Sequence, residues 1–270
     1  MRLWSLGSGS KGNALLLESG DSRVLIDAGF PARTLAQRLQ SIGIAPASIT
    51  DCVITHEHGD HCRGAAVARR KWGWILHATA GTTRGCPELA PNDVSIFVPG
   101  DTLTVGTFTL RTISSPHDAS EPVVLVATSR EGVRTGVAYD LGHVPERISK
   151  QLMELDLLVL ESNHDEQMLR SGPYPPSVQA RIASRTGHLS NRAAAECATG
   201  LVGRELTQVL LAHLSEKCND HGLAVMGMRT ALRRTSYRGQ VSALPQHAVA
   251  GPFLPGGSRA EEPPRQLSLF

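Results

Sequence analysis

The segment THEHGDH concentrates four side chains of the kinds that bind metal ions, namely His56, His58, Asp60 and His61. Imidazole nitrogens and carboxylate oxygens together suit zinc, manganese or iron. The segment follows DCVIT, which has the composition of a β-strand, so we expect the four residues on a loop at the end of that strand. One short loop supplies too few ligands to complete a site, so further ligands must come from other parts of the chain.

Three more candidate ligands stand where later apolar strands are expected to end. His117 occurs in SSPHDAS, Asp140 in VAYDLGH and His213 in LLAHLSE. Taken singly, each is equally typical of a surface or turn residue. Their shared position after a strand, and their order behind HxHxDH, indicate one metal site assembled from several strand ends.

The elements that must position these residues alternate between strands and helices. Short apolar runs bounded by Gly, Ser or Asp predict strands at residues 2–6, 14–18, 24–29, 51–55, 74–78, 102–113, 122–129, 133–139, 156–162 and 208–215. Longer segments predict helices at residues 31–43, 62–73, 145–155 and 224–234, and mainly helical structure over 165–203. Such interspersed elements favour a layered α/β architecture in one domain, residues 1–251.

Composition narrows the class of protein. A chain of 270 residues with 41% hydrophobic and 19% charged residues is typical of a globular protein with a sizeable core. The net charge of +2 argues neither for nor against a polyanionic partner. Five cysteines without a CxxC pair favour a reduced, cytoplasmic protein. We expect no signal peptide and no membrane association, since no apolar run approaches the ~18 residues of a membrane span.

The motif HxHxDH, followed in order by His117, Asp140 and His213, resembles the metallo-β-lactamase superfamily. The resemblance implies an α/β fold of the αββα sandwich type that binds two divalent cations, manganese or zinc, at its strand ends. Asp27 in LIDAG would then orient the site rather than bind metal. By the same resemblance one metal is bound by His56, His58 and His117, the other by Asp60, His61 and His213, and both by Asp140.

Six segments resemble one group of this superfamily, the YycJ/WalJ metallo-hydrolases, which are described as 5′→3′ DNA exonucleases. They are SLGSGSKGNA, THEHGDH, LESNHD, GPYP, GHLSN and AHLSEKCN. The resemblance implies a two-metal phosphodiester hydrolase that acts on DNA, with Asp60 among its catalytic residues. Cyclic phosphodiesterases of the PhnP type share much of the pattern, so a small cyclic phosphate stays open as the substrate.

Two further histidines are candidates for catalytic roles. A histidine with a pKa of about 6.5 can protonate a leaving alkoxide. His188 in TGHLSN occupies a segment from which a histidine does so in related metallo-nucleases. The alternative is a histidine at a helix start, beside the capping residues Ser190 and Asn191. His164 in ESNHD follows a strand, where it contacts phosphate, supports His188 or has no catalytic role.

Two loops are expected to contact substrate. The loop GSGSKGN, with Ser10 and Asn13, is rich in small residues and backbone N–H donors that suit a phosphate group. Because it lacks the spacing of a P-loop, it fits an ordinary strand connection equally well. Tyr174 in GPYPP either stacks on a substrate base or braces a rigid turn.

From about residue 252 the composition shifts to Pro, Gly, Ser, Arg and Glu, which predicts a disordered tail over residues 252–270. Residues 266–270, QLSLF, resemble the short peptide by which bacterial replication and repair proteins bind the DNA sliding clamp. In that resemblance Gln266 enters a polar pocket, Leu269 and Phe270 fill an apolar cleft, and Leu267 makes a secondary contact. Two alternatives stay open: a tail that folds back on its own domain, and a non-enzymatic clamp-binding adaptor with a structural metal core.

Overall fold

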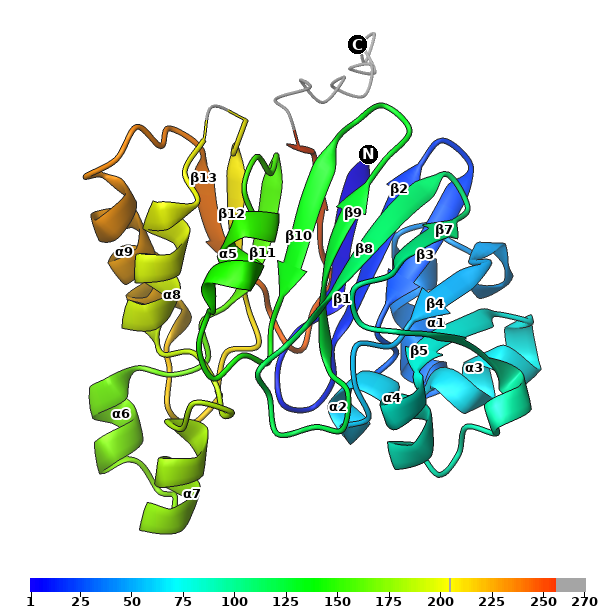
Figure 1. Ribbon diagram of the computed structural model, residues 1–270, viewed down its shortest axis with the longest axis horizontal. Coiled ribbons are helices and arrows are strands. Elements are labelled where there is room, and N and C mark those ends of the chain that lie inside the picture. Colours follow the sequence, from blue (N-terminus) through cyan, green and yellow to red (C-terminus); the bar gives the residue numbers. More distant parts are fainter. Residues whose placement is uncertain (204, 256–270) are drawn as a thin grey trace, which may run out of the picture.

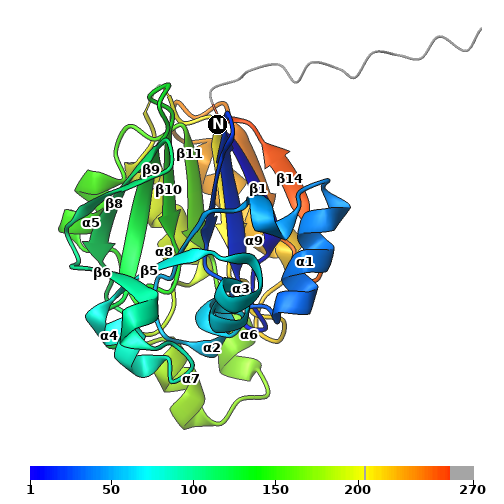
Figure 2. The same cartoon turned by 90° about the vertical axis from the view of Figure 1, so that its right-hand side faces the viewer.

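The computed structural model describes residues 1–203 and 205–255. Two seven-stranded sheets face each other (Figure 1). Helices lie on the outer side of both sheets (Figure 1), and those of the first sheet face the viewer when the molecule is turned by 90° (Figure 2). The expected αββα sandwich is confirmed.

The first sheet has the strand order β14-β1-β2-β3-β4-β5-β6. Neighbouring strands from β14 to β3 are antiparallel, and those from β3 to β6 are parallel. The strands are β1 (Arg2–Gly7), β2 (Ala14–Ser19), β3 (Ser22–Ile26), β4 (Asp51–Val53), β5 (Ile75–Thr79), β6 (Val94–Phe97) and β14 (Ala250–Phe253).

The second sheet has the order β13-β12-β11-β10-β9-β8-β7. Strands β10 to β13 are parallel, whereas β7, β8, β9 and β10 pair antiparallel in turn, so β8 runs in the same direction as β10. The carboxyl ends of β8, β10, β11 and β12 therefore meet at one edge. The strands are β7 (Thr102–Val105), β8 (Phe108–Ser114), β9 (Val123–Thr128), β10 (Arg134–Ala138), β11 (Leu157–Glu161), β12 (Gln208–Ala212) and β13 (Gln240–Ala243).

Helices pack on the outer face of each sheet. The first sheet is covered by α1 (Ala32–Ser41) and α3 (Ala65–Trp72), with α2 (Gly59–Cys62) and α4 (Ala80–Gly85) nearby. The second is covered by α5 (Glu146–Gln151), α8 (Asn191–Gly200) and α9 (His221–Leu232), while α6 (Glu166–Ser171) and α7 (Pro176–Ile182) lie beyond its end (Figure 1). Short 3₁₀ turns occupy Pro46–Ser48 and Pro91–Asp93. None of the helices in the described ranges is both long and apolar enough to cross a membrane.

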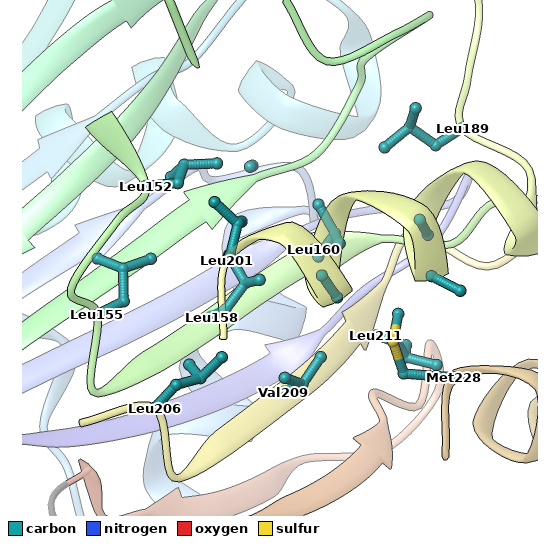
Figure 3. Packing of buried hydrophobic residues seen from close by; sticks show 14 of the residues in the cluster. Leu152, Leu155, Leu158, Leu160, Leu189, Leu201, Leu206, Val209, Leu211 and Met228 are labelled. Atoms are coloured by element: carbon teal, nitrogen blue, oxygen red, sulfur yellow. The ribbon is translucent and has the colours of Figure 1, made fainter. Parts of the chain in front are cut away.

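Apolar side chains form three layers, one between the sheets and one beneath each set of helices. Strand β11 contributes to two of them, because Leu157 and Val159 face the first sheet while Leu158 and Leu160 face the helices (Figure 3). All its residues are buried, which explains why it reads as a continuous apolar run rather than as an alternating pattern. Because both faces of β11 pack against apolar layers, the end of this strand has a fixed position in the fold.

The structure differs from the sequence predictions in its shorter elements. The segment 165–203 forms three helices, because Pro173, Pro175 and Pro176 cannot continue a helix from α6 into α7. Strands β6 and β13 were not predicted, since each has only four residues and carries exposed positions.

The domain also extends further than predicted. Pro252 and Phe253 were assigned to the tail, but they belong to β14, in which Phe253 pairs with Leu3 of β1. Phe253 packs partly buried against the layer between the sheets, so its apolar side chain outweighs the polar composition around it. The predicted clamp-binding residues 266–270 lie outside the described residues.

Candidate metal centre

The predicted ligands converge because each one follows the carboxyl end of a strand. His56 and His58 lie on the loop after β4, and Asp60 and His61 belong to the short helix α2 that ends this loop. His117, Asp140 and His213 follow β8, β10 and β12, whose ends meet at one edge of the second sheet. All seven predicted ligands are brought together.

Three residues at these strand ends adopt left-handed backbone conformations. The φ angles are 63° at Asp27, 56° at Asp140 and 53° at His213. A non-glycine residue in this region costs on the order of 1–3 kcal/mol and persists only where its surroundings enforce it. At His213 the backbone N–H donates to Ser8 Oγ at 2.9 Å, and the carbonyl accepts from Asn163 Nδ2 at 2.9 Å. The strain turns these side chains out of the strand and into the site.

Two sets of three ligands are recognisable. In the first set, His56, His58 and His117, the ligand atoms lie within 4.8 Å of one another, and His58 Nδ1 is 3.2 Å from His117 Nε2. In the second set, Asp60 Oδ2 is 3.5 Å from His61 Nε2 and 3.3 Å from His213 Nε2. Ligands about 2.0–2.2 Å from one tetrahedral ion are about 3.4 Å apart, so both sets match the spacing of a metal site.

Asp140 lies between the two sets. Its Oδ2 is 2.8 Å from His61 Nε2 without a hydrogen bond between them, and its Oδ1 is 4.0 Å from His117 Nε2. Asp140 also groups with His56 and His61 as a possible ligand cluster. The resemblance implies a carboxylate shared by two cations at this position.

The imidazoles are oriented for metal binding. In four histidines Nδ1 is hydrogen-bonded to another residue of the protein. Two of these partners are carboxylates: Asp27 lies 2.7 Å from His61 Nδ1, and Glu161 lies 3.0 Å from His213 Nδ1. The other two are Thr55 Oγ1, 3.1 Å from His56 Nδ1, and the Gly187 carbonyl oxygen, 3.1 Å from His117 Nδ1. Holding Nδ1 directs Nε2 toward the metal. His56 Nε2 and Asp140 Oδ2 are buried without a hydrogen-bond partner, a costly arrangement that a bound cation would relieve.

The protonation states differ between the two sets of ligands. Burial is the main cause that keeps the pKa of His56 well below its ordinary value and lowers the pKa of His117, so both imidazoles are neutral as ligands must be. Burial alone would raise the pKa of Asp140, but attraction to His213 and His61 outweighs it and holds this pKa well below its usual range. In the second set burial alone would lower the pKa of His61 and His213, but attraction to Asp140 outweighs it and raises both pKa values well above the ordinary value, so both rings must release a proton to bind a cation.

Asp27 supports the centre without entering it, as predicted. Its Oδ2 accepts hydrogen bonds from His61 Nδ1 at 2.7 Å and from Tyr139 Oη at 2.6 Å. Its Oδ1 accepts from the Thr55 backbone N–H at 2.8 Å. The carboxylate therefore sets the orientation of one ligand ring and ties it to the loop that carries the others.

Glu161 is a functional residue that the sequence analysis missed. Its fully buried Oε1 lies 2.8 Å from His188 Nδ1 and 3.0 Å from His213 Nδ1, and its Oε2 accepts backbone N–H groups of Leu141 and Leu189. It thus orients a ligand and a predicted catalytic residue together. The signal was available, because Glu161 ends an apolar strand just as the ligands do.

His188 lies beside the metal ligands, 22% exposed, and lines the cavity. Burial alone would lower its pKa, but attraction to Glu161 and hydrogen bonds to Asp140 and Glu161 raise it to about 9. Below that pH the ring is an imidazolium that can donate a proton. The neighbouring Ser190 caps helix α8, accepting from the Ala193 backbone N–H, and the catalytic role of His188 stays a prediction.

The predicted substrate contacts divide into two groups. A cavity of about 230 Å³ opens at the centre, and Ser10 and Tyr174 line it. Asn13 is fully buried and does not line the cavity. Its Oδ1 accepts from Ser8 and Gly9 of its own loop, and its Nδ2 donates to the Asp60 carbonyl oxygen and lies 3.1 Å from His61 Nε2, so it ties this loop to two of the ligands. His164 is also buried away from the cavity lining, with Nδ1 unpaired. Neither residue lines the cavity, so the structure favours supporting roles for both, and the three alternatives given for His164 stay open.

Comparisons with known proteins agree with this geometry. The sequence profile of the Metallo-beta-lactamase superfamily matches residues 7–149. Exodeoxyribonuclease WalJ of Streptococcus pneumoniae serotype 2 is 34% identical over 229 residues, covering 83% of this chain and 85% of WalJ. Exodeoxyribonuclease YycJ of Bacillus anthracis is 31% identical over 236 residues, covering 86% of this chain and 89% of YycJ.

Among solved structures, the metallo-beta-lactamase fold protein YhfI from Bacillus subtilis gives a TM-score of 0.70 over 92% of this chain and 98% of YhfI. Its sequence is 16% identical, so this likeness concerns the fold alone. The profile match and the two curated relatives cover most of the chain between them, including every ligand of the centre. The chain therefore belongs to the metallo-beta-lactamase superfamily, with WalJ and YycJ among its relatives.

Proposed function

We propose that this metal-dependent hydrolase is a DNA exonuclease that uses two divalent cations, manganese or zinc, and acts 5′→3′. The observation that carries the proposal is the pair of ligand sets with Asp140 between them, beside His188 in one cavity. Paired cations about 3.5–4 Å apart are typical of phosphatases, polymerases and nucleases. The names of the relatives, exodeoxyribonuclease WalJ and exodeoxyribonuclease YycJ, favour DNA as the polymer.

In this proposal the residues of the chain place ligands and supply a proton. When bound, the cations would lower the pKa of a water molecule and stabilise charge on the phosphoryl oxygens. Asp60, Asp140 and the ligand histidines hold their positions at the strand ends. His188 keeps Nδ1 against Glu161, so its Nε2–H is the proton available to the leaving oxygen. Proton transfer of this kind contributes about 10²–10⁴-fold to the rate.

A time course on DNA labelled at its 5′ or its 3′ end, with manganese present, tests the proposal. We expect mononucleotide from the 5′ label at the earliest times, and no product from the Asp60→Ala protein, which controls for contaminating nucleases. Early mononucleotide from the 3′ label would show that the enzyme acts 3′→5′ instead. If metal-loaded protein left DNA intact but hydrolysed a cyclic phosphodiester, a small-molecule phosphodiesterase would replace the exonuclease.

We further propose that residues 266–270 bind the bacterial sliding clamp and bring the enzyme to DNA in the cytoplasm during replication-linked repair. Support comes from the sequence QLSLF, in which Gln266, Leu267, Leu269 and Phe270 match the clamp-binding pattern. The double substitution Leu269→Ala and Phe270→Ala should abolish co-elution with the clamp in gel filtration. Ser268→Ala, which changes no matching position, should retain it. Unchanged co-elution of the double variant would defeat this proposal.

A further inference from the structure

Helix α7 (Pro176–Ile182) borders the cavity of the metal centre but adds nothing to the core. None of its seven residues is buried. Together with α6 it projects beyond the sheets at the end where the ligands meet (Figure 1). Since helices of globular proteins ordinarily bury an apolar face, the apolar residues of α7 call for another explanation.

The apolar side of α7 faces the cavity. Val178 and Ile182 are four positions apart, so they project from the same side of the helix. Both line the cavity together with Tyr174, which lies just before the helix. Ser177 and Ala180 are exposed and stand outside the cavity lining. Val178 is 36% exposed, so the cavity presents an uncovered apolar surface to whatever enters it.

Polar contacts fix this surface relative to the metal centre. The backbone N–H of His188 donates to the carbonyl oxygen of Ile182 at 2.8 Å. Arg181 Nε lies 2.6 Å from Asp118 Oδ2, and Asp118 directly follows the ligand His117. The helix therefore keeps a fixed distance from the ligands although it buries no residue.

The two sides of the cavity differ in character. Ser10, His58, Asp60 and His213 give the cavity polar surface at the metal centre, whereas Tyr174, Val178 and Ile182 give it apolar surface at α7. Arg181 of α7 also lines the cavity, and its charge is paired with Asp118. A nucleotide divides in the same way, into a charged phosphate and a base with apolar faces. At about 230 Å³ the cavity is smaller than the ~300–1,000 Å³ of sites for drug-sized ligands. Its size suits one nucleotide rather than a longer stretch of DNA.

We propose that α7, with Tyr174, binds the nucleobase of the terminal nucleotide while the phosphodiester of that nucleotide lies at the metal centre. The inference rests on the proposed exonuclease function and adds a substrate subsite to it. Lys217 Nζ lies 5.3 Å from the centre of the Tyr174 ring and helps to hold it. Because every base has an apolar face, such a site is sequence-tolerant. A base held there cannot stay paired, so the enzyme takes an unpaired end.

The test uses two single-stranded oligonucleotides that differ only at the terminal nucleotide, which carries thymine in one and is an abasic analogue in the other. For manganese-loaded wild type we expect kcat/KM for the first cleavage to be about 10-fold higher with the base, mainly through KM. Replacing Val178 and Ile182 together by serine should reduce this ratio to about 1–2. Ala180→Ser on the outer side of α7, which does not line the cavity, should keep it.

Folding is checked by thermal denaturation, in which the serine variant should match the wild type because α7 buries no residue. A wild-type ratio near 1, or a serine variant that keeps the wild-type ratio, would overturn the base site and leave the exonuclease standing. A wild type that cleaved neither oligonucleotide would instead overturn the exonuclease and the subsite with it. The two failures are thus distinguishable.

Discussion

The metal centre and helix α7 border the same cavity, yet they are held in place by opposite means. At the centre, Asp27, His61 and Glu161 are fully buried and hydrogen-bonded to one another or to other site residues. Helix α7 buries none of its residues and is tied down by a few polar contacts. Ligand distances must be exact to a few tenths of an ångström, whereas contact with a base tolerates movement. The buried, extensively hydrogen-bonded region is therefore the metal centre and not helix α7.

Removing the shared carboxylate should have the largest effect on the buried side of this comparison. Asp140 lies between the two sets, with Oδ2 2.8 Å from His61 Nε2 of the second set and Oδ1 4.0 Å from His117 Nε2 of the first. We expect Asp140→Ala to lower DNA hydrolysis by on the order of 10³-fold or more and to reduce the metal content. Hydrolysis rates and mass-spectrometric metal analysis measure both. Wild-type activity in this variant would refute the bridging position.

His188 stands between the two regions, since it contacts Glu161 at the centre and Ile182 of α7. We expect His188→Ala to slow DNA hydrolysis by about 10²–10⁴-fold. The loss should be below about 10-fold on a p-nitrophenyl ester of thymidine monophosphate, because that leaving group needs no proton. Equal losses on both substrates would show that His188 does not act as the acid.

The residue that orients a ligand should matter less than the ligand itself. Asp27→Asn weakens the acceptor for His61 Nδ1, so we expect zinc affinity and activity to fall by about 10–100-fold. Tyr139→Phe removes one hydrogen bond to the same carboxylate and should have a smaller effect. Calorimetric zinc titration compares the two. A larger loss for Tyr139→Phe would contradict the role assigned to Asp27.

The smallest effect is expected for a hydrogen-bonded residue pair that lies outside both the metal centre and helix α7. Asp51 Oδ1 lies 2.8 Å from His77 Nε2 between β4 and β5. Burial alone would raise the pKa of Asp51, but the hydrogen bond to His77 outweighs it and the pKa is lowered. A depressed folded pKa stabilises the protein above the unfolded value of about 3.9, and this stabilisation is lost as the pH falls through the folded pKa.

We therefore expect Asp51→Asn to lower the free energy of unfolding by about 1 kcal/mol at pH 7 while DNA hydrolysis is retained. The difference from wild type should shrink as the pH falls below about 4. Urea denaturation of both proteins at several pH values measures this difference in the free energy of unfolding. A difference that grew as the pH fell below about 4 would have the wrong sign for the lowered pKa of Asp51.

Sequence reasoning succeeded where residue type and position after a strand coincide. HxHxDH, His117, Asp140 and His213 were predicted as ligands because each is a polar residue at the end of an apolar strand, and the structure brings them together. The alternation of elements predicted a layered α/β architecture, and the resemblance to the metallo-β-lactamase superfamily implied the αββα sandwich. Short edge strands escaped prediction, since four residues such as Val94–Phe97 carry little periodic signal.

What the sequence could not supply was the direction in which side chains point. Asn13 and His164 stand close in sequence to exposed site residues, but tertiary packing buries both. Glu161 reaches two histidines from other segments, a relation that depends on the sheet order. The cavity side of α7 was likewise hidden, because periodicity shows an apolar face without showing whether it meets a core or a cavity.

The most direct test of the two-cation exonuclease is a titration of metal-free protein with manganese, in which bound ions and DNA hydrolysis are followed together. The account predicts that about two ions bind per chain and that hydrolysis reaches its plateau only when the second is bound. Asp60→Ala should bind fewer ions and stay inactive. Full hydrolysis with one ion per chain, or hydrolysis by the metal-free protein, would contradict the account.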